Sequence, residues 1–240
     1  FDTDVDRAGA VLSDGSELNR NRIIAMLSAI LLREHPGTTI VTDSITSSGL
    51  AKFIAEKGGV HHRFKRGYRN VINESIRLNA NGQDSQLAIE TSGHGALKEN
   101  YFLDDGAYLI TRIVIKLAQL KAEGKEIADL ISSLREPVER KEIRFNITES
   151  DFRPVGERVI AELEAFATAH EGWHIADDNR EGIRVSCDEA NGWFLLRLSV
   201  HDPVMPMNFE SDDVGGVQKM INSLTEFFKN QSGLDITTFK

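Results

Sequence analysis

The sequence of 240 residues has little of several features that mark common classes of protein. It holds one cysteine, Cys187, so an intramolecular disulfide is impossible and a reducing, cytoplasmic location is expected. Its longest apolar run, residues 23–32, is shorter than the roughly 20 residues that cross a bilayer. No signal peptide is evident at the start of the sequence. We therefore expect no membrane partner.

Positive charge is also scarce, because 28 Lys and Arg residues face 37 Asp and Glu residues and the net charge is −9. A general nucleic-acid-binding protein needs a basic face to displace counterions, so no nucleic-acid partner is expected. The sequence contains no G-x-G-x-x-G fingerprint and no P-loop. A phosphate ligand would depend on local positive charge. The densest stretch of such charge consists of Arg63, Lys65, Arg66 and Arg69.

The chain begins at Phe1 without an initiator methionine, directly inside an acidic motif. We expect residue 1 to be a cut, which leaves the true N-terminus unknown. Hydrophobic residues make up 40% of the sequence and charged residues 27%, and this balance predicts a globular core rather than disorder.

The first half of the sequence alternates between helical and strand patterns. Apolar residues at three- and four-residue spacing predict helices, which we place at 19–34, 44–56, 70–79 and 105–122. Short apolar runs between them predict strands at 39–42, 60–64 and 87–89. Strands that alternate with helices are typical of an α/β layer fold, in which site residues lie on loops at strand ends.

The pattern changes after Pro137, which follows a predicted helix at 126–134. Paired strands with turn signals between them are predicted at 138–147, 181–187, 192–199 and 204–209. Amphipathic helices are predicted at 153–170 and 214–229. This arrangement predicts an α+β domain with an antiparallel sheet and a domain boundary near residue 137.

Three carboxylates alternate near the start of the chain, at Asp2, Asp4 and Asp6, and Arg7 follows them. Carboxylates at alternate positions of an extended loop can converge on one hard cation. An EF-hand loop is excluded, because Arg7 stands where that motif needs glycine and Ser13 stands where it needs glutamate. A solvated acidic turn remains the alternative interpretation.

The segment Glu90–Gly95 follows the predicted strand at 87–89 and carries groups suited to a sugar. Glu90 and Ser92 can hydrogen-bond vicinal hydroxyls, and a small residue such as Gly93 lets the backbone approach a ligand. His94 can transfer a proton near neutral pH, although no Asp that would orient it is evident from the sequence. A plain polar loop is the alternative.

Two further segments carry cations that suit a phosphate. Arg197 offers bidentate recognition of phosphate, and Ser199 adds a hydroxyl two residues later. Lys65 lies in the basic stretch described above, next to Gly67. The alternative for both segments is an ordinary charged surface.

The order of these four motifs resembles the α-D-phosphohexomutase family, and the resemblance covers essentially the whole chain. The family has an Asp-x-Asp-x-Asp-Arg metal loop, a basic Lys-x-Gly segment, a Glu-x-Ser-Gly-His sugar loop and an Arg-x-Ser-x-x-x-Pro phosphate loop. The matching residues here are Asp2, Asp4, Asp6 and Arg7; Lys65 and Gly67; Glu90, Ser92, Gly93 and His94; and Arg197, Ser199 and Pro203.

The resemblance implies a particular fold and division into domains. Residues 1–18 would be the tail of a second domain, residues 19–137 an α/β domain of the family's third-domain type, and residues 138–240 a smaller α+β, TBP-like fourth domain with an antiparallel sheet. The implied activity is that of an isomerase acting as an intramolecular phosphotransferase. It interconverts hexose 1-phosphate and hexose 6-phosphate through a phosphoserine and a bisphosphate intermediate.

The resemblance also assigns roles around the reacting phosphoryl group. Asp2, Asp4 and Asp6 would hold Mg²⁺, and Arg7 would help to orient the phosphoserine. Lys65 would contact a phosphate or the sugar. This division of labour agrees with the physics of phosphoryl transfer, which depends mostly on positioning and on stabilisation of charge.

The substrate would be held by the other two motifs. Glu90 and Ser92 would bind two sugar hydroxyls with Gly93 beside them, and His94 would serve as general base or acid. Arg197 and Ser199 would bind the phosphate that does not react.

The sequence departs from the family pattern in the phosphate loop, where Val200 replaces a glycine and His201 replaces a threonine. A protonated His201 could offset this change with its charge. Thr91 lies where family members vary with the sugar, so the preferred hexose is undecided between glucose and mannose phosphates.

No segment resembling the family's catalytic serine occurs in the sequence, so we expect that serine in N-terminal domains of the same protein. We therefore expect this chain alone to be inactive. Two alternatives remain open, namely a phosphoglucosamine mutase and a non-catalytic sugar-phosphate-binding protein.

Overall fold

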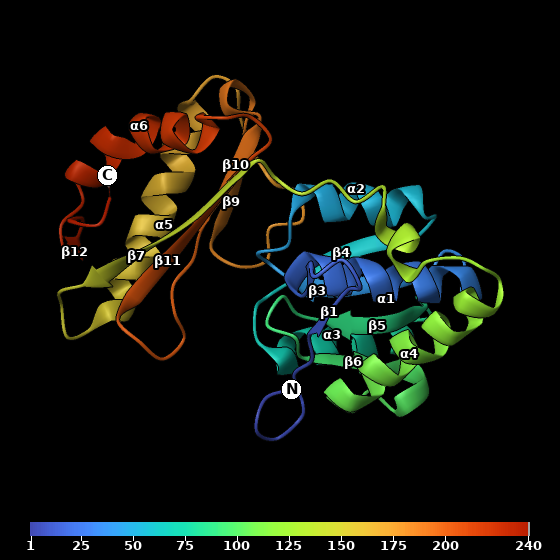
Figure 1. Ribbon diagram of the computed structural model, residues 1–240. Coiled ribbons are helices and arrows are strands. Elements are labelled where there is room, and N and C mark those ends of the chain that lie inside the picture. Colours follow the sequence, from blue (N-terminus) through green and yellow to red (C-terminus); the bar gives the residue numbers. More distant parts are fainter. Residues whose placement is uncertain (240) are drawn as a thin grey trace. The chain divides into compact units, whose positions relative to one another are not determined.

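The computed structural model describes residues 1–239, which form two compact units. Unit 1 comprises Phe1–Glu136, and unit 2 begins at Pro137. The predicted fold class is confirmed, because unit 1 is an α/β domain and unit 2 an α+β domain with an antiparallel sheet (Figure 1). Within the described residues, no helix is long and apolar enough to cross a membrane.

A four-stranded sheet of order β4-β3-β5-β6 forms the centre of unit 1. Strands β3 (Thr39–Asp43), β4 (Val60–Phe64) and β5 (Ser85–Ile89) are parallel, and β6 (Gly95–Leu97) runs antiparallel to β5. All residues of β3 and β5 are buried, as expected for strands that helices cover on both faces.

Four helices cover this sheet in a three-layer α/β/α arrangement. They are α1 (Arg20–Glu34), α2 (Ser48–Glu56), α3 (Tyr68–Ala80) and α4 (Gly106–Ala122). Apolar residues of α1, α2 and α4 form one core with the sheet, while Val71, Ile72 and Leu78 of α3 form a second core on the other face. A small hairpin of β1 (Ala10–Val11) and β2 (Glu17–Leu18) precedes α1.

Unit 2 contains a six-stranded antiparallel sheet of order β12-β7-β11-β10-β9-β8. Its strands are β7 (Glu139–Ile147), β8 (Trp173–Ile175), β9 (Ile183–Cys187), β10 (Gly192–Leu196), β11 (Val204–Ser211) and β12 (Leu234–Asp235). Helices α5 (Phe152–Ala169) and α6 (Gly216–Lys229) pack on the sheet (Figure 1). In the shared core Phe145 stacks on Phe228 with 4.6 Å between ring centroids.

Two predicted helices differ from the structure. The helix expected from residue 44 begins at Ser48, where the Ser47 hydroxyl accepts a hydrogen bond from the Leu50 amide at 2.9 Å and caps the first turn. The helix expected at 126–134 is only a short 3-10 turn, η2 (Ile127–Ile131). Ile127, Leu130 and Ile131 are buried in the core within this turn, and Leu134 packs on the core beyond it, so packing requires no longer helix. Shorter 3-10 turns lie at η1 (Lys98–Asn100) and η3 (Asp188–Ala190).

Candidate functional site

The carboxyl ends of the three parallel strands lie at one edge of the unit 1 sheet. The strands end at Asp43, Phe64 and Ile89. The Lys65–Gly67 segment follows the second of these ends, and the Glu90–His94 segment follows the third. Parallel α/β sheets usually bind their ligands at this edge, so the topology brings two of the predicted segments together.

The Glu90–His94 segment, called the glutamate turn below, connects β5 to the antiparallel β6. The Gly93 amide donates to the Glu90 carbonyl at 3.1 Å, and the Glu90 amide donates to the His94 carbonyl at 2.9 Å. Gly93 has φ 102°, and a Cβ at this position would lie 2.8 Å from the Ala8 carbonyl oxygen. Glycine is therefore required here both by backbone conformation and by close approach.

The carboxylate of Glu90 holds the turn against the basic segment. Its Oε1 accepts a hydrogen bond from the Gly67 amide at 2.5 Å, and its Oε2 accepts one from the Ser92 hydroxyl at 3.1 Å. Glu90 is 3% exposed, while Ser92 and Lys65 are exposed. The arrangement presents a hydroxyl backed by a buried carboxylate, which can bind a pair of neighbouring hydroxyl groups.

Asp43, which the sequence reading did not single out, fixes the same turn from the end of β3. Its carboxylate accepts hydrogen bonds from the Thr91 hydroxyl at 2.7 Å and from the Thr91 amide at 3.4 Å. Full burial of the carboxyl group and the nearby charge of Glu90 raise the pKa of Asp43 to about 6. This residue therefore changes its protonation state close to the neutral range.

His94 lies between two carboxyl groups. Its Nδ1 is 2.8 Å from Oδ2 of Asp104 and 3.6 Å from Oδ1 of Asp6, and its ring stacks on Tyr68 at 4.9 Å between centroids. The sequence did not reveal an aspartate that orients His94. In the structure this aspartate is Asp104, which lies ten residues further along the chain and packs back beside β6. Burial raises the pKa of Asp104, while the neighbouring His94 acts to lower it.

Asp2–Arg7, called the aspartate loop below, gathers its three carboxylates as the alternation predicts. Oxygen atoms of Asp2, Asp4 and Asp6 all lie within 4.8 Å of one another. The Arg7 Nε donates to Asp2 at 2.5 Å, and this hydrogen bond holds the pKa of Asp2 at about 2, well below its usual range. Asp2 is therefore ionised at neutral pH and available as an anionic ligand.

Backbone contacts join the aspartate loop to the glutamate turn. Arg7 pairs with His94 in an antiparallel bridge, and the Ala8 amide donates to the Gly93 carbonyl at 3.1 Å. The Gly106 amide, at the start of α4, donates to the Val5 carbonyl at 3.1 Å. The two predicted motifs thus form one continuous assembly, although more than eighty residues separate them in sequence.

The donor set of the aspartate loop fits a hard divalent cation. All three side chains offer carboxylate oxygens, which are the ligands that Mg²⁺ and Ca²⁺ prefer. Val5, between two of the aspartates, has φ 66°, an unusual conformation for a β-branched residue. The hydrogen bond from Gly106 to the Val5 carbonyl helps to hold this conformation, so the fold actively maintains the shape of the loop.

Arg197–Pro203, called the arginine loop below, joins β10 to β11 in unit 2. The Arg197 amide donates to the Pro206 carbonyl at 3.1 Å and the Ser199 amide to the Val204 carbonyl at 2.9 Å, so these residues extend the hairpin. Leu198 packs against the core of unit 2. Because successive strand residues point to opposite faces, Arg197 and Ser199 are directed to the other side of the sheet.

The tip of this loop is open to solvent. Val200 is 61% exposed, and His201 and Pro203 are also exposed. The Ser199 hydroxyl oxygen accepts a hydrogen bond from the Asp202 amide at 3.3 Å, which leaves its hydrogen available to a ligand. Arg197, Ser199 and His201 are thus close together in sequence within one hairpin, where His201 is exposed and Arg197 and Ser199 are half-buried.

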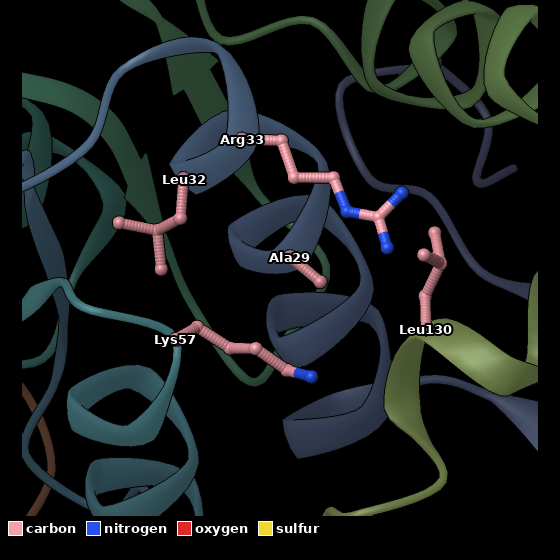
Figure 2. Close-up of a pocket in the computed structure, with 5 residues that line it drawn as sticks. All are labelled: Ala29, Leu32, Arg33, Lys57 and Leu130. Carbon is pink, nitrogen blue, oxygen red and sulfur yellow. The ribbon is translucent and has the colours of Figure 1, made fainter.

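A small cavity of about 60 Å³ lies at the opposite edge of the unit 1 sheet. Arg33 and Lys57, which line it, precede the amino ends of β3 and β4 (Figure 2). The remaining lining residues are Ala29, Leu32 and Leu130. None of the predicted site residues contributes to this cavity, which is therefore separate from the candidate site.

The fold defines the class of this chain, which is an α/β/α domain of the phosphohexomutase third-domain type followed by a smaller α+β domain. Residues 19–137 match the family model for the phosphoglucomutase/phosphomannomutase alpha/beta/alpha domain III. The chain belongs to the phosphoglucomutase/phosphomannomutase family of α-D-phosphohexomutases.

Its relatives are longer proteins. A phosphomannomutase/phosphoglucomutase of Pseudomonas putida is 29% identical over 223 residues, which cover 92% of this chain and 44% of the relative. A phosphoglucomutase of Neisseria gonorrhoeae is 26% identical over 92% of this chain and 45% of its own length. The chain thus spans somewhat less than half the length of these relatives.

Solved structures share the fold. A phosphoglucomutase/phosphomannomutase family protein of Burkholderia thailandensis superposes with a TM-score of 0.76 at 26% identity, covering 97% of this chain and 47% of that protein. An N-acetylphosphoglucosamine mutase of Aspergillus fumigatus, solved with GlcNAc-6P and magnesium, superposes with a TM-score of 0.57 at 11% identity, covering 94% of this chain and 50% of that protein. At this identity the second likeness concerns the fold alone.

Proposed function

We propose that the chain is the C-terminal, metal- and sugar-binding part of a phosphohexomutase that interconverts hexose 1-phosphate and hexose 6-phosphate, with glucose and mannose phosphates as substrates. The observation that carries the proposal is the assembly of the aspartate loop and the glutamate turn around His94. Relatives named phosphoglucomutase and phosphomannomutase support the choice of sugars.

Asp2, Asp4 and Asp6 are the residues that would hold Mg²⁺, because their carboxylate oxygens are hard ligands gathered in one place. A bound Mg²⁺ would supply positive charge to stabilise a phosphoryl group during transfer. Arg7, next to the triplet and held by Asp2, would add a cation beside the transferred group, and the exposed Lys65 would contact a phosphate or the sugar.

His94 would act as general base or acid at its Nε2 atom. The Asp104 carboxylate accepts from Nδ1 and so favours the tautomer whose Nε2 lone pair is free to take a proton. The Tyr68 ring fixes the plane of the imidazole. The two neighbouring groups therefore set both the direction and the protonation pattern that proton transfer requires.

Glu90 and Ser92 would bind two sugar hydroxyls, with Gly93 allowing the sugar to approach the backbone. In the free chain the Ser92 hydroxyl donates to Glu90. A bound sugar hydroxyl would take over the Glu90 Oε2 acceptor and release Ser92 to bond a second hydroxyl. This exchange leaves no buried carboxylate oxygen without a partner, so it costs little.

Arg197, Ser199 and His201 would bind the phosphate that does not react. The guanidinium can form two parallel hydrogen bonds to phosphate, and the exposed side chain of His201 nearby is accessible to the same ligand. The arginine loop is an exposed hairpin tip, a kind of element that can close over a ligand.

The catalytic serine would belong to N-terminal domains of the whole, cytoplasmic protein, which would complete the active site. In this division, residues 1–18 end the second domain, residues 19–137 form the third and residues 138–240 form the fourth. The 240-residue chain should therefore bind ligands without catalysing turnover.

Calorimetric titration with glucose 1-phosphate, mannose 1-phosphate and glucosamine 1-phosphate, with and without Mg²⁺, tests the proposal. We expect glucose 1-phosphate and mannose 1-phosphate to bind the chain. The isosteric Glu90→Gln variant should bind them about tenfold more weakly, because a neutral amide accepts hydrogen bonds less strongly than a carboxylate. Glu123→Gln, at the exposed end of α4, is the matched control and should bind as the parent chain does.

Arg197→Ala tests the contribution of unit 2 in the same titration. Its loss of affinity should extend to inorganic phosphate, whereas Glu90→Gln should affect only the sugar phosphates. Tighter binding of glucosamine 1-phosphate than of the other two would favour a phosphoglucosamine mutase. Absence of binding by every hexose phosphate, or equal binding by the parent and both variants, would contradict the proposal.

A further inference from the structure

His94, Asp6 and Asp104 form a cluster in which two carboxylates face a single imidazole nitrogen. The neutral imidazole carries at most one proton on Nδ1, and that proton is shared with Asp104 at 2.8 Å. Oδ1 of Asp6 lies 3.6 Å from the same nitrogen, is inaccessible to solvent and has no hydrogen-bond partner within residues 1–239. Two carboxylates thus converge on a group that can satisfy only one of them.

A small cation would satisfy all three side chains at once. Their ligand atoms lie within 4.8 Å of one another. In a tetrahedral site with metal–ligand bonds of about 2.0–2.1 Å, neighbouring ligand atoms lie on the order of 3.3 Å apart. The separations of His94 Nδ1 from Asp104 and from Asp6, 2.8 and 3.6 Å, fall on either side of this value, so the histidine and each carboxylate can reach one ion with a small movement.

The surroundings hold the three ligands in place. The other oxygen of Asp104 accepts a hydrogen bond from the Gly95 amide at 3.0 Å, which fixes that carboxylate. Tyr68 stacks on the imidazole, and the Arg7–His94 bridge fixes the backbone next to Asp6. Such support around metal ligands strengthens binding, because the ligand side chains already have fixed orientations before the ion binds.

We propose that Asp6, His94 and Asp104 form a second divalent-cation site that prefers a borderline ion such as Zn²⁺ and shares Asp6 with the aspartate loop. The imidazole nitrogen distinguishes this set from the all-oxygen set of Asp2, Asp4 and Asp6, since nitrogen ligands suit Zn²⁺ better than Mg²⁺. The two sites should therefore select different ions and compete for one carboxylate.

Occupancy would change the state of His94. An ion on Nδ1 places the remaining imidazole proton on Nε2, so Nε2 can no longer accept one. In an enzyme with the function proposed above, such an ion would act as an inhibitor. The metal site itself does not rest on that function, because it is defined by affinity for an ion in the absence of any sugar.

Calorimetric titration of the chain with Zn²⁺, in buffer that contains excess Mg²⁺, tests the site. We expect one binding event, which His94→Asn and Asp104→Asn each weaken by at least about tenfold, as losses around metal ligands commonly do. Asp4→Asn removes a ligand that belongs only to the aspartate loop and should not weaken Zn²⁺ binding, because Mg²⁺ then competes less strongly for the shared Asp6.

His62→Asn is the matched control for loss of a histidine. His62 Nε2 pairs with Glu74 at 2.9 Å, but no third ligand completes a cluster around it within residues 1–239. This variant should bind Zn²⁺ like the parent chain. Circular dichroism of each variant verifies that unit 1 remains folded.

A second measurement follows the imidazole directly by NMR. Zn²⁺ should shift the His94 ring resonances and leave those of His62 in place, and added Mg²⁺ should weaken Zn²⁺ binding because Asp6 is shared. The proposal is overturned if the parent chain binds no Zn²⁺, if Asp4→Asn weakens binding as much as His94→Asn does, or if His94→Asn keeps the parent affinity.

Discussion

The glutamate turn of unit 1 and the arginine loop of unit 2 both join antiparallel strands, yet they are built in different ways. The glutamate turn is held by buried carboxylates, namely Glu90 bonded to Gly67 and Asp43 bonded to Thr91, and by the contact of Gly93 with Ala8. The arginine loop is held mainly by hairpin hydrogen bonds and by Leu198, with its tip exposed.

This difference suits the parts that the two loops would have in binding. A turn fixed by interior contacts keeps its hydrogen-bonding groups in one geometry, which favours discrimination between hydroxyl positions. An exposed hairpin tip can move with little loss of packing, which favours closure on a phosphate and release of it. The consequence is that substitutions in the glutamate turn should reduce stability, whereas substitutions at the exposed tip of the arginine loop should alter mainly binding.

The largest effect is expected from Gly93→Ala. The new Cβ would lie 2.8 Å from the Ala8 carbonyl oxygen in a residue with φ 102°, so strain and overlap add together. We expect the free energy of unfolding of unit 1 to fall by about 3 kcal/mol. Chemical denaturation followed by tyrosine absorbance measures this change, because Tyr68, Tyr101 and Tyr108 all lie in unit 1.

Gly82→Ala separates the two causes. Gly82 has φ 82°, but a Cβ there would have nothing within 4 Å. Its substitution should cost only about 1 kcal/mol, the strain of the backbone alone. Equal losses in the two variants would show that the contact with Ala8 contributes nothing to the rigidity of the turn.

The second effect is a dependence of the stability of unit 1 on pH, which arises from the buried carboxyl group of Asp43. Its pKa is raised from 3.8 to about 6 in the folded state, so the folded chain binds a proton more tightly than the unfolded chain does. Stability from this group is therefore present below pH 3.8 and is lost as the pH rises toward about 6. The whole loss amounts to about 3 kcal/mol at most, from 1.36 kcal/mol for each pKa unit.

Asp43→Asn removes the titration while keeping the shape of the side chain. The fall in stability of unit 1 across this pH window should shrink in the variant relative to the parent chain. The same tyrosine-monitored unfolding at a series of pH values measures it. A variant with the pH dependence of the parent would show that another group is responsible.

The contrast between the loops also explains what sequence reasoning could reach. Periodic apolar residues, and glycines at the ends of helices and strands, are local signals. They placed the strand at 60–64 and the helix at 105–122 close to the observed β4 and α4. The short strands β6, β8 and β12 were missed, because two or three residues carry too little pattern and form strands only where a neighbouring strand pairs with them.

The order of the motifs was sufficient to place the candidate residues on loops. It did not reveal the distant residues that hold these loops in place by hydrogen bonds. Asp43 and Thr91 are 48 residues apart, Gly67 and Glu90 are 23 apart, and His94 and Asp104 are ten apart. No local pattern predicts such pairs, since each depends on which strand ends meet in the fold. A carboxylate at the end of a buried strand, such as Asp43, is the one sequence signal that would have suggested a residue holding a neighbouring loop in place.

A smaller effect is expected in unit 2 from Leu198→Ala. Leu198 is the residue by which the arginine loop packs on the core, and it contacts the Gly156 position of α5. Because the side chain is only partly buried, its truncation should lower the stability of unit 2 by about 1–2 kcal/mol. Tryptophan fluorescence measures this change separately from unit 1, because Trp173 and Trp193 both lie in unit 2. Leu134→Ala, on the core of unit 1, should leave that signal unchanged and serves as the control.

The smallest effect on folding should come from His201→Ala. The side chain is exposed at the tip of the arginine loop, so the stability of unit 2 should change by no more than about 0.5 kcal/mol. Affinity for inorganic phosphate should nevertheless fall, and the fall should be smaller at high salt if charge carries the interaction. Tryptophan-monitored unfolding and phosphate titration of one protein preparation measure both quantities. A loss of stability as large as that of Leu198→Ala would show that the tip of the arginine loop is part of the folded core, and the distinction between the two loops would then fail.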